Sequence, residues 1–190
     1  MKKKAFALFL ALALVVGGVV GGTVAWLTAK SDVVTNTFTT SDIKVELTET
    51  TGREYKMVPG YTISKNPKAT VLAGSEECYL FVKLDKSTNF DTYLGYAIAD
   101  GWTQLTTDKD GNTITDLVYY RKVLTADVGT AYSVLANDQV TVKTDVTKAN
   151  MNALAEATYP TLTFTAYASQ LHKSAGVEFT AAEAWANIAA

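Results

Sequence analysis

The sequence predicts an all-β fold, a jelly-roll-like β-sandwich with one or two short helices. After the first 25 residues the chain is rich in Thr, Val and Tyr, which favour the pleated surface of a strand. Apolar and polar residues alternate in many short segments that are separated by turn residues. The 190 residues are 48% hydrophobic and 19% charged, which suits one domain with a sizeable core.

The period-2 alternation predicts where the strands lie, because successive side chains of a strand point to opposite faces. The expected strands are residues 34–39, 43–47, 69–72, 78–84, 113–123, 139–143 and 161–167. Residues 73–77 form the turn between the third and fourth of these. Residues 90–100 fit no element, and their aromatic residues suggest a covering loop.

Two segments have the composition of helices. Residues 147–157 are rich in helix formers and begin with Thr147 as a candidate N-cap. Thr180 and Glu183 have the spacing of a capping box, which predicts a short C-terminal helix. In that helix Trp185 and Ile188 lie three residues apart, so we expect both to face the sandwich.

The N-terminus has the pattern of an export signal. Three lysines follow Met1, an apolar run covers residues 5–16, and small residues lead to Ala25. The alternative is a retained membrane helix, since residues 5–25 approach the ~20 needed to span a bilayer. The glycine pairs and the small-residue exit favour cleavage. We therefore expect a signal peptide at 1–25, an N-terminal extension at 26–40 and a sandwich domain at 41–190.

Export places the rest of the chain outside the cytoplasm, with membrane contact only through the uncleaved signal. The formal net charge of the chain is −2. No cluster of Lys and Arg gives the basic footprint of a nucleic-acid-binding protein, so we expect no nucleic acid as partner.

The residues that could support catalysis are few. His172 is the one histidine, which excludes an HExxH zinc site, and no nucleophile elbow is present for a serine hydrolase. We expect His172 to be exposed at the end of a strand. Cys78 is the one cysteine and lies in an apolar run, which favours a buried small residue over a reactive thiol. A Cys78–His172 pair is the alternative.

Acidic residues give two further candidates. The pair Glu76–Glu77 comes before a strand and beside a glycine, so we expect a solvated turn. Asp108, Asp110 and Asn112 match the first three ligand positions of an EF-hand loop, but Gly111 stands at position 4 instead of 6. We expect a hairpin turn at Asp110–Gly111, with an ion site as the alternative. The sequence therefore predicts no metal, no cofactor and no enzyme.

Several segments taken together resemble one known family. They are residues 21–28, 36–39, 43–47, 58–60, 65–71, 78–83, 164–170 and 184–185. Their order and content resemble the camelysin/TasA family of secreted Gram-positive proteins, whose signals are cut by a SipW-type signal peptidase. The resemblance implies a jelly-roll sandwich and cleavage between Ala25 and Trp26. It also implies that the protein is a subunit of extracellular fibres or biofilm matrix and is secreted to the matrix or the cell surface. The partner of each subunit would be another copy of the same chain.

In TasA-like fibres the segment after the cleavage site is donated to the next subunit as a β-strand. Carried over to this chain, that segment is residues 26–40. Val34, Asn36 and Phe38 would share one face of the strand, with Phe38 as the anchor. The alternatives are that the segment forms the first strand of its own domain or a disordered leader. Exchange of this strand between copies would give open filaments.

Two other functions fit the same composition. One is a monomeric cell-surface adhesin or binding module. The other is a secreted camelysin-like protease, for which the sequence offers no metal-ligand set.

Overall fold

A computed structural model of the chain describes residues 42–52 and 54–188. The chain divides between Thr39 and Thr40, and every described residue belongs to the second unit, 40–190. The predicted signal and extension lie outside the described residues, together with their named positions Ala25, Trp26, Val34, Asn36 and Phe38.

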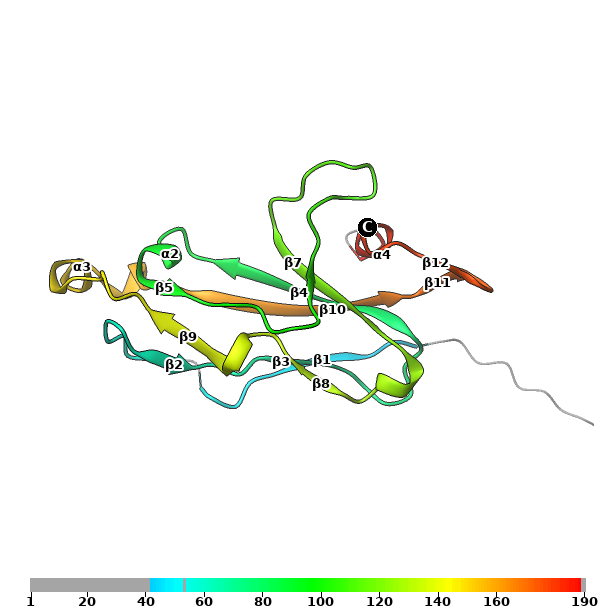
Figure 1. The fold of residues 1–190 in the computed structure, drawn as a ribbon, viewed down its shortest axis with the longest axis horizontal. Coiled ribbons are helices and arrows are strands. Elements are labelled where there is room, and N and C mark those ends of the chain that lie inside the picture. The colour runs from blue at the N-terminus through cyan, green and yellow to red at the C-terminus, as the bar shows by residue number, and fades with distance from the viewer. Residues whose placement is uncertain (1–41, 53, 189–190) are drawn as a thin grey trace, which may run out of the picture. The chain divides into compact units, whose positions relative to one another are not determined.

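The described chain is mostly antiparallel β-sheet, so the prediction of an all-β fold is confirmed (Figure 1). The strands are β1 (Val45–Thr48), β2 (Thr62–Ser64), β3 (Lys68–Val71), β4 (Cys78–Lys86), β5 (Leu94–Gly95), β6 (Thr103–Gln104), β7 (Leu117–Val123), β8 (Ala131–Ser133), β9 (Gln139–Val142), β10 (Leu162–Gln170), β11 (His172–Ser174) and β12 (Val177–Glu178). The helices are α2 (Phe90–Tyr93), α3 (Lys148–Asn152) and α4 (Ala181–Ala186). Single turns of 3₁₀-helix occur at Thr125–Asp127, Ala136–Asp138 and Glu156–Thr158.

One layer of the sandwich is a four-stranded sheet with the order β10-β4-β7-β6. The strand β4 begins with the apolar run 78–82, which is buried on both faces of the sheet. The side chains of Cys78, Leu80 and Val82 enter the core between the layers. Those of Tyr79 and Phe81 enter a second core on the outer face.

The other layer consists of two three-stranded sheets, β1-β3-β8 and β2-β9-β5, that continue one another. Between them Lys65 N–H donates to the Asp138 carbonyl (2.8 Å) and Val134 N–H donates to the Pro67 carbonyl (2.9 Å). The chain changes direction between β8 and β9 at Asn137 and Asp138, whose φ angles are 55° and 51°. Asn and Asp tolerate this left-handed conformation better than most residues.

Helix α4 covers the outer face of the four-stranded sheet. The Thr180 hydroxyl accepts from Glu183 N–H (3.3 Å) and Glu183 Oε2 accepts from Thr180 N–H (2.8 Å), which confirms the capping box. The Trp185 ring lies 5.2 Å from the Phe81 ring between centroids. Ile188 packs in the same core, so the predicted orientation of Trp185 and Ile188 is confirmed.

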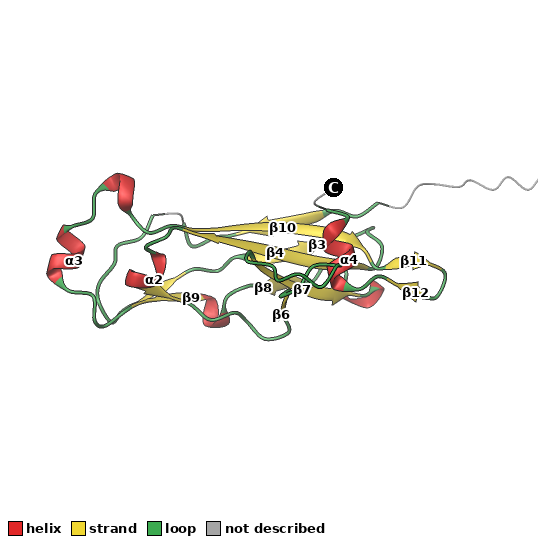
Figure 2. Ribbon diagram, turned by 90° about the horizontal axis from the view of Figure 1, so that it is seen from above, coloured by secondary structure: helices red, strands yellow, loops and turns green. Residues whose placement is uncertain are grey.

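The sandwich has two ends, which we name by β4. At the proximal end β4 begins, and Glu76 N–H donates to the carbonyl of Asp42 (3.4 Å). At the distal end β4 leads into α2, and Lys143 N–H donates to the Tyr93 carbonyl (2.9 Å). Figures 1 and 2 show α2, α3 and β9 at the distal end and the β11–β12 hairpin at the proximal end.

The turn at residues 73–77 is present, but the two strands that it joins enter different layers. β3 pairs with β1 and β8, whereas β4 pairs with β10 and β7. The turn therefore carries the chain across the sandwich. Local alternation predicts a strand but not its partner, because pairing depends on residues far away in the sequence.

Two predicted elements are shorter in the structure. The strand expected at 113–123 begins at Leu117, because Thr113 instead bridges Thr107 and closes a loop. The helix expected at 147–157 ends at Asn152. Beyond it, Ala155 N–H donates to the Thr158 hydroxyl (2.9 Å), a local bond that competes with helix continuation. The third helix, α2, lies in the region where the pattern predicted no element.

Among residues 42–52 and 54–188, no helix is long and apolar enough to cross a membrane.

Candidate functional site: an open seam between two edge strands

The strands β1 and β10 are the edges of the two layers on the same side of the sandwich. Within the described chain, β1 pairs only with β3 and β10 pairs only with β4. We call the boundary between these two strands the seam. Figure 2 shows β10 next to β4, toward the border of the domain.

The core is incompletely covered along the seam. Val45 and Leu47 of β1, and Phe164 and Ala166 of β10, pack against the inter-layer core but are only half-buried. One strand further in, Val71 and Leu80 have 0% exposure. The seam therefore leaves apolar side chains available to a further strand.

The edge of β10 lacks the charge, the proline and the bulge that commonly protect an edge strand. Its nine residues, LTFTAYASQ, contain no charge and no proline. Its register with β4 is regular from Leu162 to Gln170, so no bulge twists the edge away. In an antiparallel edge strand alternate residues turn N–H and C=O groups outward. The strand is therefore suited to accept another strand.

Lys65 closes the distal part of the seam. Its Nζ lies 2.8 Å from Glu49 Oε1 and 5.4 Å from the centroid of the Phe164 ring. The Tyr55 hydroxyl donates to the same Glu49 oxygen (3.1 Å), and its ring centroid is also 5.4 Å from Nζ. The Lys65 side chain is only 12% exposed. This cluster fixes the chain after β1 and limits the open part of the seam to the segment beyond Phe164.

The predicted donor residues lie outside the described residues, whereas the seam was not predicted. A signal for it exists in the sequence, because residues 162–170 alternate without any charge. Alternation alone does not show that this strand is an edge. That follows only from the sheet order.

Glu77 holds three segments together at the proximal end. Its Oε1 accepts from the N–H (3.2 Å) and hydroxyl (3.0 Å) of Thr125, and its Oε2 lies 3.2 Å from His172 Nε2. These bonds, that from the Thr125 backbone first, lower the pKa of Glu77. The expectation of a merely solvated turn is incomplete for Glu77. The side chain of His172 is 43% exposed in β11, as expected.

Cys78 is fully buried in the inter-layer core, which confirms its prediction as a small buried residue. Burial raises the pKa of its thiol to about 11. At neutral pH the side chain is therefore a thiol and not a nucleophilic thiolate. His172 is bonded to Glu77, so the structure gives no support to a Cys78–His172 pair.

The loop at residues 108–112 is a hairpin turn, as expected, but its central residues are Lys109 and Asp110 instead of Asp110 and Gly111, because Gly111 N–H donates to the Asp108 carbonyl (3.2 Å). Asp108 Oδ1 accepts from the N–H groups of Asp110 (2.9 Å) and Asn112 (2.8 Å), and Oδ2 accepts from the Asn112 side-chain amide (3.0 Å). These bonds, that from the Asn112 side chain first, lower the pKa of Asp108. The carboxylate of Asp108 thus accepts hydrogen bonds from within its own loop. In the part of the chain that is described, no three His, Cys, Asp or Glu residues are grouped to hold a metal ion.

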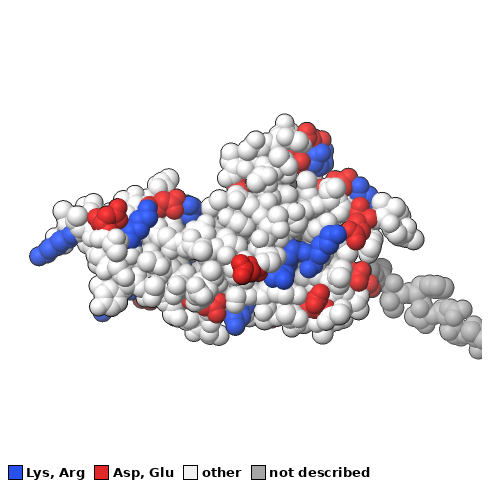
Figure 3. All heavy atoms as spheres, in the orientation of Figure 1, with Lys and Arg blue, Asp and Glu red and all other residues white. Residues whose placement is uncertain are grey.

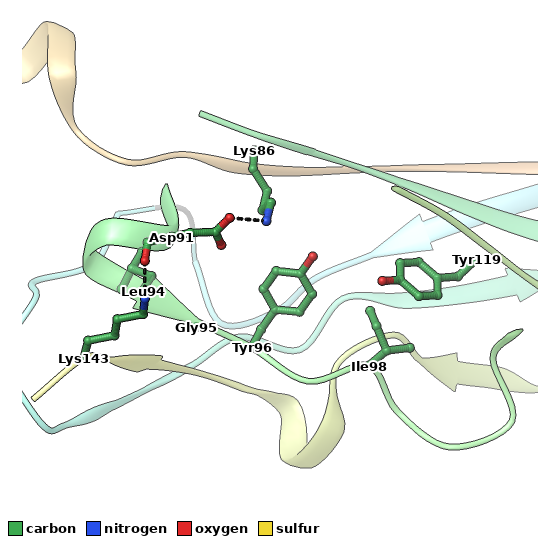
Figure 4. Close-up of a pocket in the computed structure, with 8 residues that line it drawn as sticks. All are labelled: Lys86, Asp91, Leu94, Gly95, Tyr96, Ile98, Tyr119 and Lys143. Atoms are coloured by element: carbon green, nitrogen blue, oxygen red, sulfur yellow. Dashed lines mark hydrogen bonds and ion pairs between the residues drawn. The ribbon is translucent and has the colours of Figure 1, made fainter. Parts of the chain in front are cut away.

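A cavity of about 440 Å³ opens between β4, β7 and the segment around β5. Lys86 stands in it, bonded to Asp91 (2.6 Å), with its Nζ 5.8 Å from the centroid of the Tyr96 ring. Figure 4 shows the Tyr119 hydroxyl pointing toward Tyr96 across the cavity. Neither tyrosine hydroxyl has a hydrogen-bond partner among the described residues. Burial raises the pKa of Tyr96 to about 12.

The surface shown in Figure 3 carries dispersed charges of both signs and no large patch of one sign. Comparison with known proteins gave no match: no family model, no curated protein and no solved structure matches this chain. The resemblance to the camelysin/TasA family therefore stays a prediction.

Proposed function

We propose that this chain is a non-enzymatic, secreted structural subunit that assembles into extracellular fibres. Residues 26–40 of one copy add to the seam of the next copy as a β-strand. A SipW-type signal peptidase releases the segment by cleavage between Ala25 and Trp26. The observation that carries the proposal is the long, uncharged and unpaired edge of β10 beside an incompletely covered core.

The proposed donor strand and β10 carry apolar side chains of complementary size. The inward positions of β10 beyond Phe164 are Ala166 and Ala168, which leave room for larger side chains. Val34 and Phe38 would place their apolar groups over these alanines and complete the core. Asn36 lies between them on the same face.

The direction of the chain favours β10 as the acceptor. Asp42, to which the extension is joined, lies at the proximal end, where β4 begins. If the acceptor copy is stacked on the proximal end of the donor copy, the donated strand enters the acceptor at the acceptor's distal end. From residue 26 to residue 40 the donated strand then runs toward the distal end of the acceptor. It is therefore antiparallel to the acceptor's β10. About 15 extended residues at ~3.4 Å each reach roughly 50 Å, more than the length of β10.

The first experiment compares two purified forms, one from Trp26 to Ala190 and one from Asp42 to Ala190. We expect filaments in electron micrographs of the long form only. The substitution Phe38→Asp in the long form should abolish filaments, while Thr37→Asp, on the opposite face of the strand, should not. Assembly of the short form would contradict strand donation, and a long form that stays monomeric would contradict assembly itself.

Secretion is tested separately, on the cells that make the protein. We expect the extracellular protein to begin at Trp26 when its N-terminus is sequenced. Retention of residues 1–25 in the membrane fraction would contradict the cleavage proposal.

A second candidate function is a monomeric surface-binding module, which the cavity with the Tyr96 and Tyr119 hydroxyls favours. A glycan array tests this function. Binding that is lost in the double variant Tyr96→Phe and Tyr119→Phe would support it. A protease is tested by casein digestion with and without a chelator, and we expect no digestion by the pure protein.

A further inference from the structure

Exposed large apolar side chains are confined to the two ends of the sandwich. Within the described chain they are Leu124 (45% exposed), Val177 (49%), Val58 (48%), Tyr61 (68%) and Tyr159 (55%). Single exposed apolar residues are common on protein surfaces. Their restriction to opposite ends is the feature that needs an explanation.

Leu124 and Val177 belong to the proximal end. Leu124 lies between Val123, which pairs with Cys78 at the start of β4, and Thr125, which bonds to Glu77. Val177 lies in β12, whose partner β11 is held to Glu77 through His172. The shared carboxylate of Glu77 thus anchors both segments to the same end.

Val58, Tyr61 and Tyr159 belong to the distal end. Tyr61 N–H donates to the Val58 carbonyl (3.0 Å), and this turn is held by a bond from Gly60 N–H to the Val142 carbonyl (3.1 Å). Tyr159 follows Thr158, whose carbonyl accepts from the Asn89 side chain (2.8 Å) just before α2. Val58 and Tyr61 therefore lie beside Val142, the last residue of β9, and Tyr159 lies near the start of α2, so all three are at the distal end.

We infer that these two ends are the two halves of a head-to-tail contact between successive copies of the chain. Leu124 and Val177 of one copy pack against Val58, Tyr61 and Tyr159 of the next. The inference rests on the proposed function and adds to it a second contact, distinct from the seam. The partner is a second copy because the extension is joined at Asp42 on the same end as Leu124 and Val177.

The contact is weak by itself, since five side chains give far less area than the ~800 Å² per partner of a stable interface. The inserted strand changes this by acting as a tether. It holds the two ends together at an effective concentration that for short tethers reaches about the millimolar range. The contact fixes the spacing and direction of successive copies. Different patches on its two sides give an open chain of copies rather than a closed dimer.

The test uses the long form, Trp26 to Ala190, with charges placed on one end at a time. One variant carries Leu124→Asp and Val177→Asp, and the other carries Val58→Asp and Tyr61→Asp. The matched control is Gln104→Asp, an exposed residue of the edge strand β6. We expect each end variant to raise the critical concentration for assembly, measured by sedimentation, at least tenfold. The control should leave it unchanged, and all three should melt as the unmodified protein does.

Mixing the two end variants separates a head-to-tail contact from other packing. Each variant keeps one intact end, so the mixture should form two-membered complexes with one intact contact and no long filaments. Peptide 26–40 should bind the short form, Asp42 to Ala190, equally well with and without the end substitutions. If the unmodified protein forms filaments and the end variants assemble as well as it does, this inference is wrong while strand donation stands. If the unmodified protein does not assemble, both are wrong.

Discussion

The outer face of the four-stranded sheet and the seam at its β10 edge are built from the same strands but are covered very differently. On the outer face, α4 places Trp185 against Phe81 and Tyr167, with ring centroids 5.2 and 5.4 Å apart. At the seam, Phe164 and Ala166 face the core but remain half-buried. The chain thus supplies its own cover for the outer face, and its described part supplies none for the edge.

This difference shows which surface the described chain covers by itself and which it leaves open. Covering a face requires only side chains, and a short amphipathic helix can provide them. Covering an edge requires another backbone, because the unpaired groups are N–H and C=O. We therefore expect folding stability to depend mainly on the covered face, and the proposed assembly to depend on the seam.

The largest expected effect comes from removing an aromatic ring from the covered face. Phe81 has 0% exposure, and Phe81→Ala in the short form should cost about 3–5 kcal/mol of unfolding free energy. Phe164→Ala should cost clearly less in the same form, because half-buried side chains leave less transfer energy to lose. Urea unfolding followed by circular dichroism measures both. Equal costs would show that the seam is already closed in a single copy.

A peptide of residues 26–40 should stabilise the short form by binding at the seam. At a concentration 100 times its Kd, such a ligand adds ~2.7 kcal/mol to the unfolding free energy. Thermal unfolding with increasing peptide measures the effect, and the same peptide with Phe38→Asp is the control. A melting temperature that does not respond to the peptide would rule out the seam as the acceptor.

Loss of the α4 cap should weaken the covered face by a smaller amount. Thr180→Ala removes the hydroxyl that accepts from Glu183 N–H and should cost about 1 kcal/mol. It should also shift the fluorescence of Trp185, which lies in that helix. Thr147→Ala removes the equivalent cap of α3 and is the matched control, since it should leave the Trp185 emission unchanged. The same emission shift in both variants would contradict a local role for α4.

The smallest expected effect is a pH dependence that belongs to the covered face alone. The bond from Lys173 and then those from Thr180 lower the pKa of Glu183 from 4.5 to about 2. A carboxylate with a lowered pKa stabilises the folded state above about pH 4.5, and this stabilisation is lost as pH falls from there toward 2. Calorimetric melting temperatures between pH 6 and 2 should fall less steeply in Glu183→Gln. Glu156→Gln, whose carboxylate makes no ion pair among the described residues, should keep the original slope.

Much of the local structure could be predicted because its causes lie within a few residues. The alternation at residues 43–47 places Val45 and Leu47 inward, as found in β1. The Thr180 and Glu183 pair forms the expected box, and Asp108 closes the expected turn. The apolar run around Cys78 indicated a buried strand. In each case the interacting groups are separated by at most a few positions in the chain.

The candidate site could be predicted only in part. The alternation of Val34, Asn36 and Phe38 predicts a strand, and only the family resemblance implies that it is donated; neither identified an acceptor. Residues 162–170 read as an ordinary half-buried strand. The cavity between Tyr96 and Tyr119 was also beyond prediction, because β7 and the segment after β5 meet only in the folded domain.

By itself, the sequence determined the all-β class, the helix caps, the presence of a turn within residues 108–112 and the buried state of Cys78. Only the tertiary structure decided that β3 and β4 lie in different layers, that β10 is an edge, and that exposed apolar residues lie at opposite ends. The physical reason is range. Alternation, capping and turns depend on neighbours along the chain, whereas the identity of an edge strand depends on every pairing made by segments far apart in the sequence.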